Sequence, residues 1–303
     1  MDEYEDDIFD EEDEEYEAAP ILESEETLII MHRDAHFNGQ FDLMLEYYQN
    51  DSKGVQDEIA ISQIEKLRAI EEESGANLGA FLLSGAEMER IGASRKIYRE
   101  LQSLYEDYQT SLPQLIADLI LSEELEPEKE IAAVAKEGKK AVSLLLDLVR
   151  SDQFYDPLFP GYGYAPTHAA ECLGQIGDPA SIRPLFELLG HHDFNNEEVV
   201  LSALRGIGKE TKKFLEHLVA SSPITNDNIQ AAIAYISFDI DPEIGEFCFN
   251  QLQREEVLAR ADLARYLIWG CEHLKDRSKL KTLLAHPKLA EPLKKEIHQI
   301  IFL

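Results

Sequence analysis

A chain of 303 residues, 44% of them hydrophobic, is long enough to bury a sizeable core, and its net charge of −32 opposes general binding to phosphate backbones. Its three cysteines, Cys172, Cys248 and Cys271, all fall on expected helices, which favours buried free thiols in a reducing compartment over a disulfide framework. The sequence shows no signal-peptide pattern and no run of 18 apolar residues, so we expect a cytoplasmic protein that does not enter a membrane.

Residues 1–26 form a strongly acidic leader, with 15 acidic residues and no basic residue. Dense like charge with few apolar groups cannot offset the entropy of ordering a chain, so we expect this leader to be disordered. Aromatic residues such as Tyr4 and Phe9 interrupt the acidic run. The leader fits three interpretations: a solubilising tail, a docking segment for a basic partner through Tyr4 and Phe9, or a mask over the basic C-terminal helices of residues 275–303.

Residues 27–110 are predicted to form an N-terminal helical segment. Phe41, Met44, Leu45 and Tyr48 lie on one helical stripe, a second stripe begins at Ile61, and a long helix is expected over residues 87–108. Diverged repeats and a helical cap both fit this pattern, since the end units of a repeat array need an atypical outer face. We favour diverged repeats.

Residues 111–303 are predicted to be an array of helical repeats, interrupted by an insertion at residues 152–166. The insertion contains three prolines, two glycines and five aromatic residues, namely Phe154, Tyr155, Phe159, Tyr162 and Tyr164. One interpretation is a loop that folds over its own repeat and buries these rings. The other is a partner-binding loop, because repeat insertions often emerge on the binding face and aromatic residues are common interface anchors. These five residues are therefore candidate partner-binding residues, together with Tyr4 and Phe9 of the leader.

The strongest periodicity begins at residue 165 and has a period of 31 residues. Each unit opens with a helix whose apolar residues recur at i, i+3, i+4 and i+7. The fourth unit fits only if its stripe slips by one residue, to Leu263, Tyr266 and Leu267. The other three stripes are Ala169, Cys172, Leu173 and Ile176; Val200, Ala203, Leu204 and Ile207; and Ala231, Ala234, Tyr235 and Phe238.

Glycines fall at the ends of these first helices, at Gly177, Gly208 and Gly270. A residue that ends a helix favours positive φ, which glycine adopts without steric cost, so we expect all three to be helix-ending residues. A second apolar helix follows each glycine, and Asp178 with Pro179 begins the first of them. One such pair cannot bury its apolar face alone, so the pairs must stack. The pattern predicts an all-α protein, a right-handed α-solenoid.

The residues from Ala170 to Leu189 read A-x-x-L-G-x-I-G-D-P-x-x-I-x-P-L-x-x-L-L. This segment resembles a short HEAT repeat of the phycobilisome-lyase type, and the resemblance extends over residues 165–219 before it fades. It implies a helical repeat scaffold and little about chemistry, because most such repeats serve protein interactions. Deoxyhypusine hydroxylase, a HEAT-like enzyme family, holds iron with repeated His-Glu pairs. Here the matching position reads His168-Ala169, so the glutamate is missing, and the later repeats contain no His-Glu pair.

No nucleotide-binding, nucleophile-elbow or C-x-x-C motif occurs. The pair His32 and His36 lacks further local ligands, and His191-His192 falls in a loop, so we expect no metal and no cofactor. We therefore expect a non-catalytic scaffold, adaptor or chaperone-like protein that binds a protein partner, and a basic protein is one candidate. The alternatives are a metal-dependent enzyme of the HEAT-repeat type, with a site not visible in the sequence, and an acidic mimic that occupies a nucleic-acid site on a basic protein.

Overall fold

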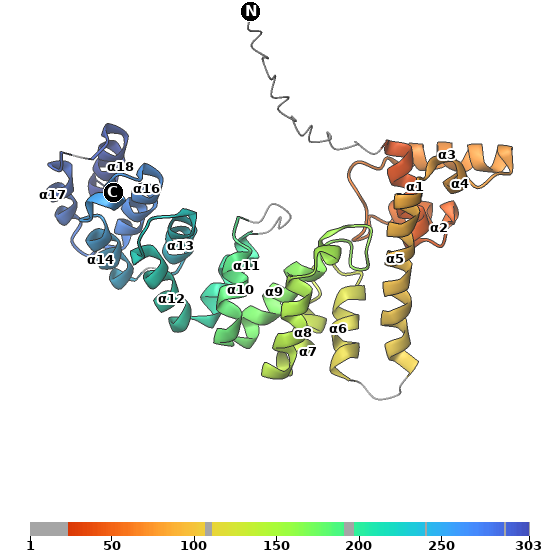
Figure 1. Ribbon diagram of the computed structural model, residues 1–303, viewed down its shortest axis with the longest axis horizontal. Helices are drawn as coiled ribbons and strands as arrows, with labels where there is room; N and C mark the ends of the chain where they lie inside the picture. Colours follow the sequence, from red (N-terminus) through yellow and green to blue (C-terminus); the bar gives the residue numbers. More distant parts are fainter. Residues whose placement is uncertain (1–23, 107–110, 191–196, 240, 288, 303) are drawn as a thin grey trace, which may run out of the picture.

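The computed structural model describes residues 24–106, 111–190, 197–239, 241–287 and 289–302. Within these ranges the protein consists of α-helices, short 3-10 helices and connecting turns, with no β-strand. The prediction of an all-α protein is therefore confirmed. The helices follow one another in an open, bowed arrangement, with the N-terminal helices at one end and the C-terminal helices at the other (Figure 1).

The N-terminal part begins at Ser24, whose hydroxyl accepts a hydrogen bond from the backbone N–H of Thr27 at 3.3 Å. Glu25 and Glu26 form the first helical turn, where acidic side chains complement the helix dipole. These residues, which the sequence placed in the leader, therefore belong to a helix, while residues 1–23 with Tyr4 and Phe9 lie outside the described residues. The N-terminal helices are α1 (Glu25–His36), α2 (Phe41–Gln49), α3 (Ile61–Ser74), α4 (Gly79–Leu82) and α5 (Gly85–Ser103), followed by η1 (Leu104–Glu106).

A buried arginine holds this part together. Arg33 of α1 has no exposed side-chain surface, and its Nη1 donates to both carboxylate oxygens of Glu71 in α3, at 3.0 and 2.9 Å. Its guanidinium also lies 4.5 Å from the centre of the Phe41 ring in α2. The predicted stripe of α2 is buried as expected, but Ile61 of the α3 stripe is 38% exposed. It begins α3 one turn before Ile64, the first buried residue of that helix.

The remaining helices run from residue 112 to the C-terminus. They are α6 (Leu112–Leu121), α7 (Glu128–Lys136), α8 (Lys139–Val149), η2 (Asp152–Tyr155), α9 (Ala165–Ile176), η3 (Pro179–Ser181), α10 (Ile182–Glu187), α11 (Glu197–Ile207), α12 (Lys209–Ala220), α13 (Asn226–Ile236), α14 (Pro242–Gln251), α15 (Glu255–Leu258), α16 (Ala261–Gly270), η4 (Cys271–His273), η5 (Arg277–Lys279), α17 (Leu280–Leu284) and α18 (Glu291–Phe302).

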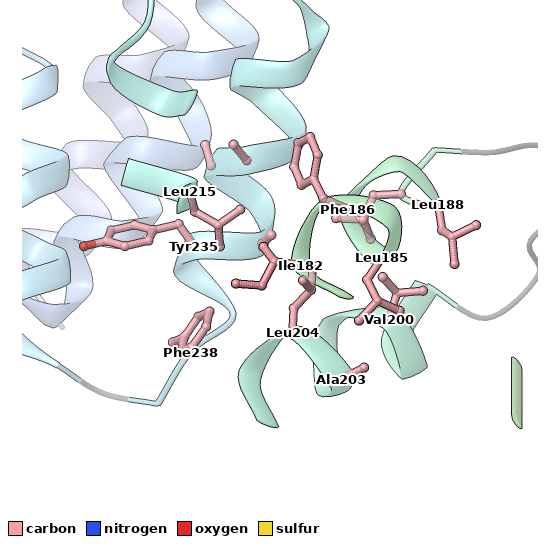
Figure 2. Close-up of a cluster of buried hydrophobic side chains, with 14 of the residues drawn as sticks. Ile182, Leu185, Phe186, Leu188, Val200, Ala203, Leu204, Leu215, Tyr235 and Phe238 are labelled. Carbon is pink, nitrogen blue, oxygen red and sulfur yellow. The ribbon is translucent and has the colours of Figure 1, made fainter. Parts of the chain in front are cut away.

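The 31-residue stripes form the core of this second part. All of their residues in α9, α11 and α13 are buried except Ile176, which is half-buried, and in α16 the stripe slips as predicted, with Leu263 and Leu267 fully buried. Side chains of α10, α11, α12 and α13, with Phe238 just after α13, meet in one cluster (Figure 2). The sequence-distant units thus share a continuous core, which is how paired helices bury faces that none could bury alone.

Glycines serve two different purposes in this core. Gly177 ends α9 and Gly208 follows α11, with φ of +69° and +85°, as predicted. Gly270 is the last residue of α16, but the predicted positive φ is wrong there, because its φ is −58° and the chain continues directly into η4. A Cβ atom there would lie 2.5 Å from the Sγ of Cys248. A glycine is therefore required at position 270 by a close helix contact and not by a positive φ.

The helix pair α9 and α11 makes another such contact. A Cβ atom on Gly174 would lie 2.5 Å from the Cα of Ala203, and one on Gly206 would lie 2.9 Å from the carbonyl oxygen of Gly174. Small residues therefore allow the two backbones to approach closely. No helix in the described part of the chain is both long and apolar enough to cross a membrane.

Candidate functional site

The insertion packs against the N-terminal helices. It extends from η2 to Tyr164, because Ala165 and Pro166, assigned to it from sequence, already belong to α9. In Figure 1 it is the green loop beside α5. Leu158 and Phe159 share a buried apolar cluster with Met31 and Ala35 of α1 and with Ile91 of α5. We call this contact of residues 152–164 with the N-terminal helices the joint.

Tyr162 is at the centre of the joint. Its φ is +54°, an uncommon value for a residue with a Cβ atom, and it lies between Gly161 and Gly163, which also have positive φ. This turn directs the ring inward, 4.6 Å from the ring centre of His36 and 6.0 Å from that of Tyr47. Burial, together with a hydrogen bond to Tyr47, raises the pKa of Tyr162 well above its usual range. The hydroxyl therefore stays protonated.

The imidazole of His36 bridges the two sides of the joint. Its Nε2 donates to the carbonyl oxygen of Pro157 at 3.0 Å, so its Nδ1 accepts the hydroxyl proton of Tyr98 at 2.7 Å. Burial lowers the pKa of His36 to about 4, which keeps the ring neutral, and burial also lowers the pKa of the adjacent His32. Because both nitrogens of His36 have protein partners, this ring serves the joint and not a metal ion. The described residues contain no group of three or more His, Cys, Asp or Glu side chains arranged to hold a metal.

The five candidate aromatic residues of the insertion have different environments. Phe154 and Tyr155 are half-buried against the repeat core, where the Tyr155 hydroxyl donates to the carbonyl oxygen of Val149 at 2.7 Å. Phe159 and Tyr162 are buried in the joint, whereas Tyr164 is 38% exposed. The insertion therefore covers the N-terminal helices as well as its own repeat, which neither sequence interpretation foresaw. A partner-binding role for the five stays a prediction, and Tyr164 is the most exposed of them.

A groove of about 680 Å³ opens next to Tyr164, between α7, α9 and α11. We call it the acidic groove. Its described lining residues are Leu125, Glu126, Glu128, Ile131, Tyr164, Thr167, His168, Glu171, Gly174, Gln175, Val199, Ser202, Ala203 and Gly206.

The charged side chains among the described lining residues of this groove are all acidic. Glu126, Glu128 and Glu171 line it, and no lysine or arginine is among its described lining residues. Burial raises the pKa of Glu171, and repulsion from Glu126 and Glu128 raises it further. A positively charged group bound in the groove would offset this repulsion between the carboxylates.

His168 lies in the wall of the groove and is only 4% exposed. Its Nε2 donates to the carbonyl oxygen of Leu125 at 3.3 Å, so its Nδ1 carries the lone pair. That Nδ1 has no hydrogen-bond partner among the described residues. Burial, and then the charge of Lys53, lower the pKa of His168 to about 4, so the ring is neutral near pH 7. A buried acceptor without a partner is uncommon.

The sequence singled out Tyr164, and His168 entered only as the histidine of an incomplete His-Glu pair. It missed the three glutamates, because Glu171 is far in sequence from Glu126 and Glu128 and the chain contains 60 acidic residues. The predicted loop pair His191-His192 lies outside the described residues. No family model, no curated protein and no solved structure matches this chain.

Proposed function

We propose that this protein is a non-catalytic scaffold or adaptor, built as a right-handed α-solenoid of short HEAT-like repeats, that binds a basic segment of a partner protein in the acidic groove. The observation that carries the proposal is a groove with three glutamates, and no lysine or arginine, among its described lining residues, next to the exposed side chains of Leu125 and Tyr164. A lysine or arginine side chain supplies a positive charge and N–H donors for the carboxylates. A basic segment is therefore the complementary occupant.

The solenoid part of the proposal is supported by the packing of the repeats. The 31-residue stripes are buried between successive helices, and the side chains of neighbouring units share one cluster (Figure 2). Stacked helix pairs create long surfaces suited to binding extended segments. Three buried free cysteines support residence in a reducing compartment such as the cytoplasm.

The exposed apolar residues at the groove support a protein as the partner. Leu125 is 62% exposed and Tyr164 is 38% exposed, and both line the groove. Interfaces combine such anchors with a polar rim, and tyrosine is enriched among residues that dominate binding energy. A small inorganic cation would leave these apolar surfaces unused.

The test is binding of a fluorescently labelled lysine–serine peptide to the full chain, measured by anisotropy at several salt concentrations. The groove variant changes Glu126, Glu128 and Glu171 to Gln. The matched control changes Glu65, Glu73 and Glu89 to Gln, since these side chains are exposed on α3 and α5 and the net charge changes equally. We expect the groove variant to lose at least about tenfold in affinity, which corresponds to one lost charge-assisted contact. The control should lose less than about twofold.

Equal losses in the two variants would mean that the peptide responds only to net charge, and the proposal would be wrong. The same titration on a chain lacking residues 1–23 separates the groove from the acidic leader. Groove binding should remain after this deletion. If affinity disappears with the leader, the leader is the docking segment and the groove is not.

A further inference from the structure

Leu125 lies between two hollows. It belongs to the linker of residues 122–127 that joins α6 to α7, and its side chain is 62% exposed. It lines the acidic groove and also a second hollow of about 530 Å³. The second hollow is lined by Asn50, Asp51, Ser52, Lys53, Glu123, Glu124, Leu125 and Glu126. The two hollows are therefore neighbours that share Leu125 and Glu126.

The second hollow is also predominantly acidic. Asp51, Glu123 and Glu124 are exposed. Its one described cation, Lys53, is 4% exposed, and its Nζ donates inward to the carbonyl oxygen of Ser122 at 2.9 Å. Burial lowers the pKa of Lys53 to about 8. Lys53 therefore stabilises the linker from inside the protein. The charged groups that remain accessible to a partner in this hollow are the carboxylates.

The linker is held from both sides. On the side of the second hollow, the Tyr47 hydroxyl donates to Glu123 Oε2 at 2.6 Å and accepts the backbone N–H of Gly54 at 3.0 Å. On the side of the acidic groove, His168 donates to the carbonyl oxygen of Leu125 at 3.3 Å. A surface that is fixed before binding loses little entropy when a partner arrives, which favours affinity.

We propose that a single extended segment of the basic partner lies across both hollows, with an apolar side chain on Leu125 and basic side chains on either side of it. This inference rests on the proposed function and specifies the partner chemistry: an apolar residue between two groups of lysine or arginine. One basic group would face Glu126, Glu128 and Glu171. The other would face Asp51 and Glu124.

Other partner chemistries fit the surface less well. A wholly apolar segment would remove carboxylates from water without a compensating charge, which is costly. A purely basic segment would place a charged side chain against Leu125 and leave the leucine without an apolar contact. The alternation of acidic, apolar and acidic surface favours the corresponding basic, apolar and basic pattern.

The test uses three labelled peptides of equal length and charge, titrated against the full chain. The first has leucine between two lysine groups, the second has glutamine in that place, and the third has the leucine moved to one end. We expect the first peptide to bind about tenfold more tightly than the other two, the scale expected for partial burial of two leucines.

The variant Leu125→Gln should remove this preference and leave the affinity of the glutamine peptide within about twofold. Leu43→Gln is the matched control, because Leu43 of α2 is also exposed, at 43%. It should retain the preference. Since both leucines are exposed, circular dichroism melting curves should show both variants folded.

If all three peptides bind equally and Leu125→Gln changes nothing, this inference is wrong, while binding in the acidic groove still stands. If the leucine preference persists in Leu125→Gln, the apolar contact lies elsewhere and the inference is again wrong. If no peptide binds, the proposed function itself fails, and this inference fails with it.

Discussion

The ring of Tyr162 lies against the backbone of Gly54, so closely that a Cβ atom at position 54 would overlap the ring. The contact joins the insertion to the loop between α2 and α3. It depends on two local features, the absence of a side chain at Gly54 and the left-handed turn that directs Tyr162 inward. Adding one methyl group at position 54 therefore tests how much the joint contributes to the stability of the protein.

We expect Gly54→Ala to destabilise the protein by about 1–3 kcal/mol, because a methyl group forced against a buried ring is a case of overpacking. The measurement is the free energy of unfolding in urea, followed by circular dichroism. Gly92→Ala is the control, since a Cβ atom there, on the exposed surface of α5, meets nothing within 4 Å. That change should be neutral or stabilising by up to about 1 kcal/mol. Equal stability of the two variants would contradict the described joint.

The close contact of α9 and α11 gives a second prediction. Gly174→Ala should cost about 1–3 kcal/mol, because its Cβ atom would lie 2.5 Å from the Cα of Ala203 and the helices would have to separate. Gln175→Ala, at the exposed neighbouring position, should change stability by less than about 0.5 kcal/mol. Hydrogen exchange of the amides in α9 and α11 would show whether the loss is centred there. A harmless Gly174→Ala would mean that the helices are farther apart than described.

Acid should weaken the joint before it protonates most carboxylates. The unfolded chain protonates His36 near its ordinary pKa of 6.5, whereas the folded chain does so only near pH 4. Between these values the unfolded state binds more protons, so stability falls as pH is lowered from about 6.5 to about 4. The loss is at most about 1.4 kcal/mol for each pH unit in that window. His36→Gln should have a shallower slope there, and an unchanged slope would assign the effect to other groups.

The cysteines should be unreactive in the folded protein. Burial raises the pKa of Cys172 and of Cys248 to about 12, and raises that of Cys271 as well. The thiolate is the nucleophile, so a soluble disulfide reagent at pH 8 should modify all three only after unfolding in urea. Reaction kinetics by absorbance, followed by mass spectrometry, would test this. Rapid labelling of Cys172 without denaturant would contradict its burial between α9 and the neighbouring helices.

The periodic part of the fold could be predicted from the sequence because its information is local. Ala169, Cys172 and Leu173 mark a buried helix face by spacing alone, and the same spacing recurs in the later units. Even the slip in α16 could be seen, since Leu263 and Leu267 carry the apolar face that Asp262 and Arg265 cannot. The positive φ predicted for Gly270 was wrong because the sequence does not distinguish a glycine required by a close helix contact from a glycine required by positive φ.

The joint and the acidic groove could not be predicted in the same way. The hydrogen bonds of His36 to Tyr98 and Pro157 connect residues 62 and 121 positions apart, and no local pattern marks them. The aromatic insertion did indicate an unusual segment, but exposure and burial of its rings depend on what packs against it. In the groove, Glu171 is distinguished from the other acidic residues only by its neighbours in space. The site is formed by tertiary contacts between segments, and none of these segments carries a sequence motif of its own.

The joint also has a consequence for synthesis on the ribosome. Helices α1, α2 and α5 leave the exit tunnel before the insertion does, so the surface formed by Met31, His36 and Ile91 is completed only when Phe159 and Tyr162 have been translated. Domains commonly fold in the order in which they emerge. Here the N-terminal helices emerge with part of their apolar face still uncovered. The insertion that covers this face is translated later, within the repeat array. The nascent chain thus has a defined interval in which that face is open to a chaperone.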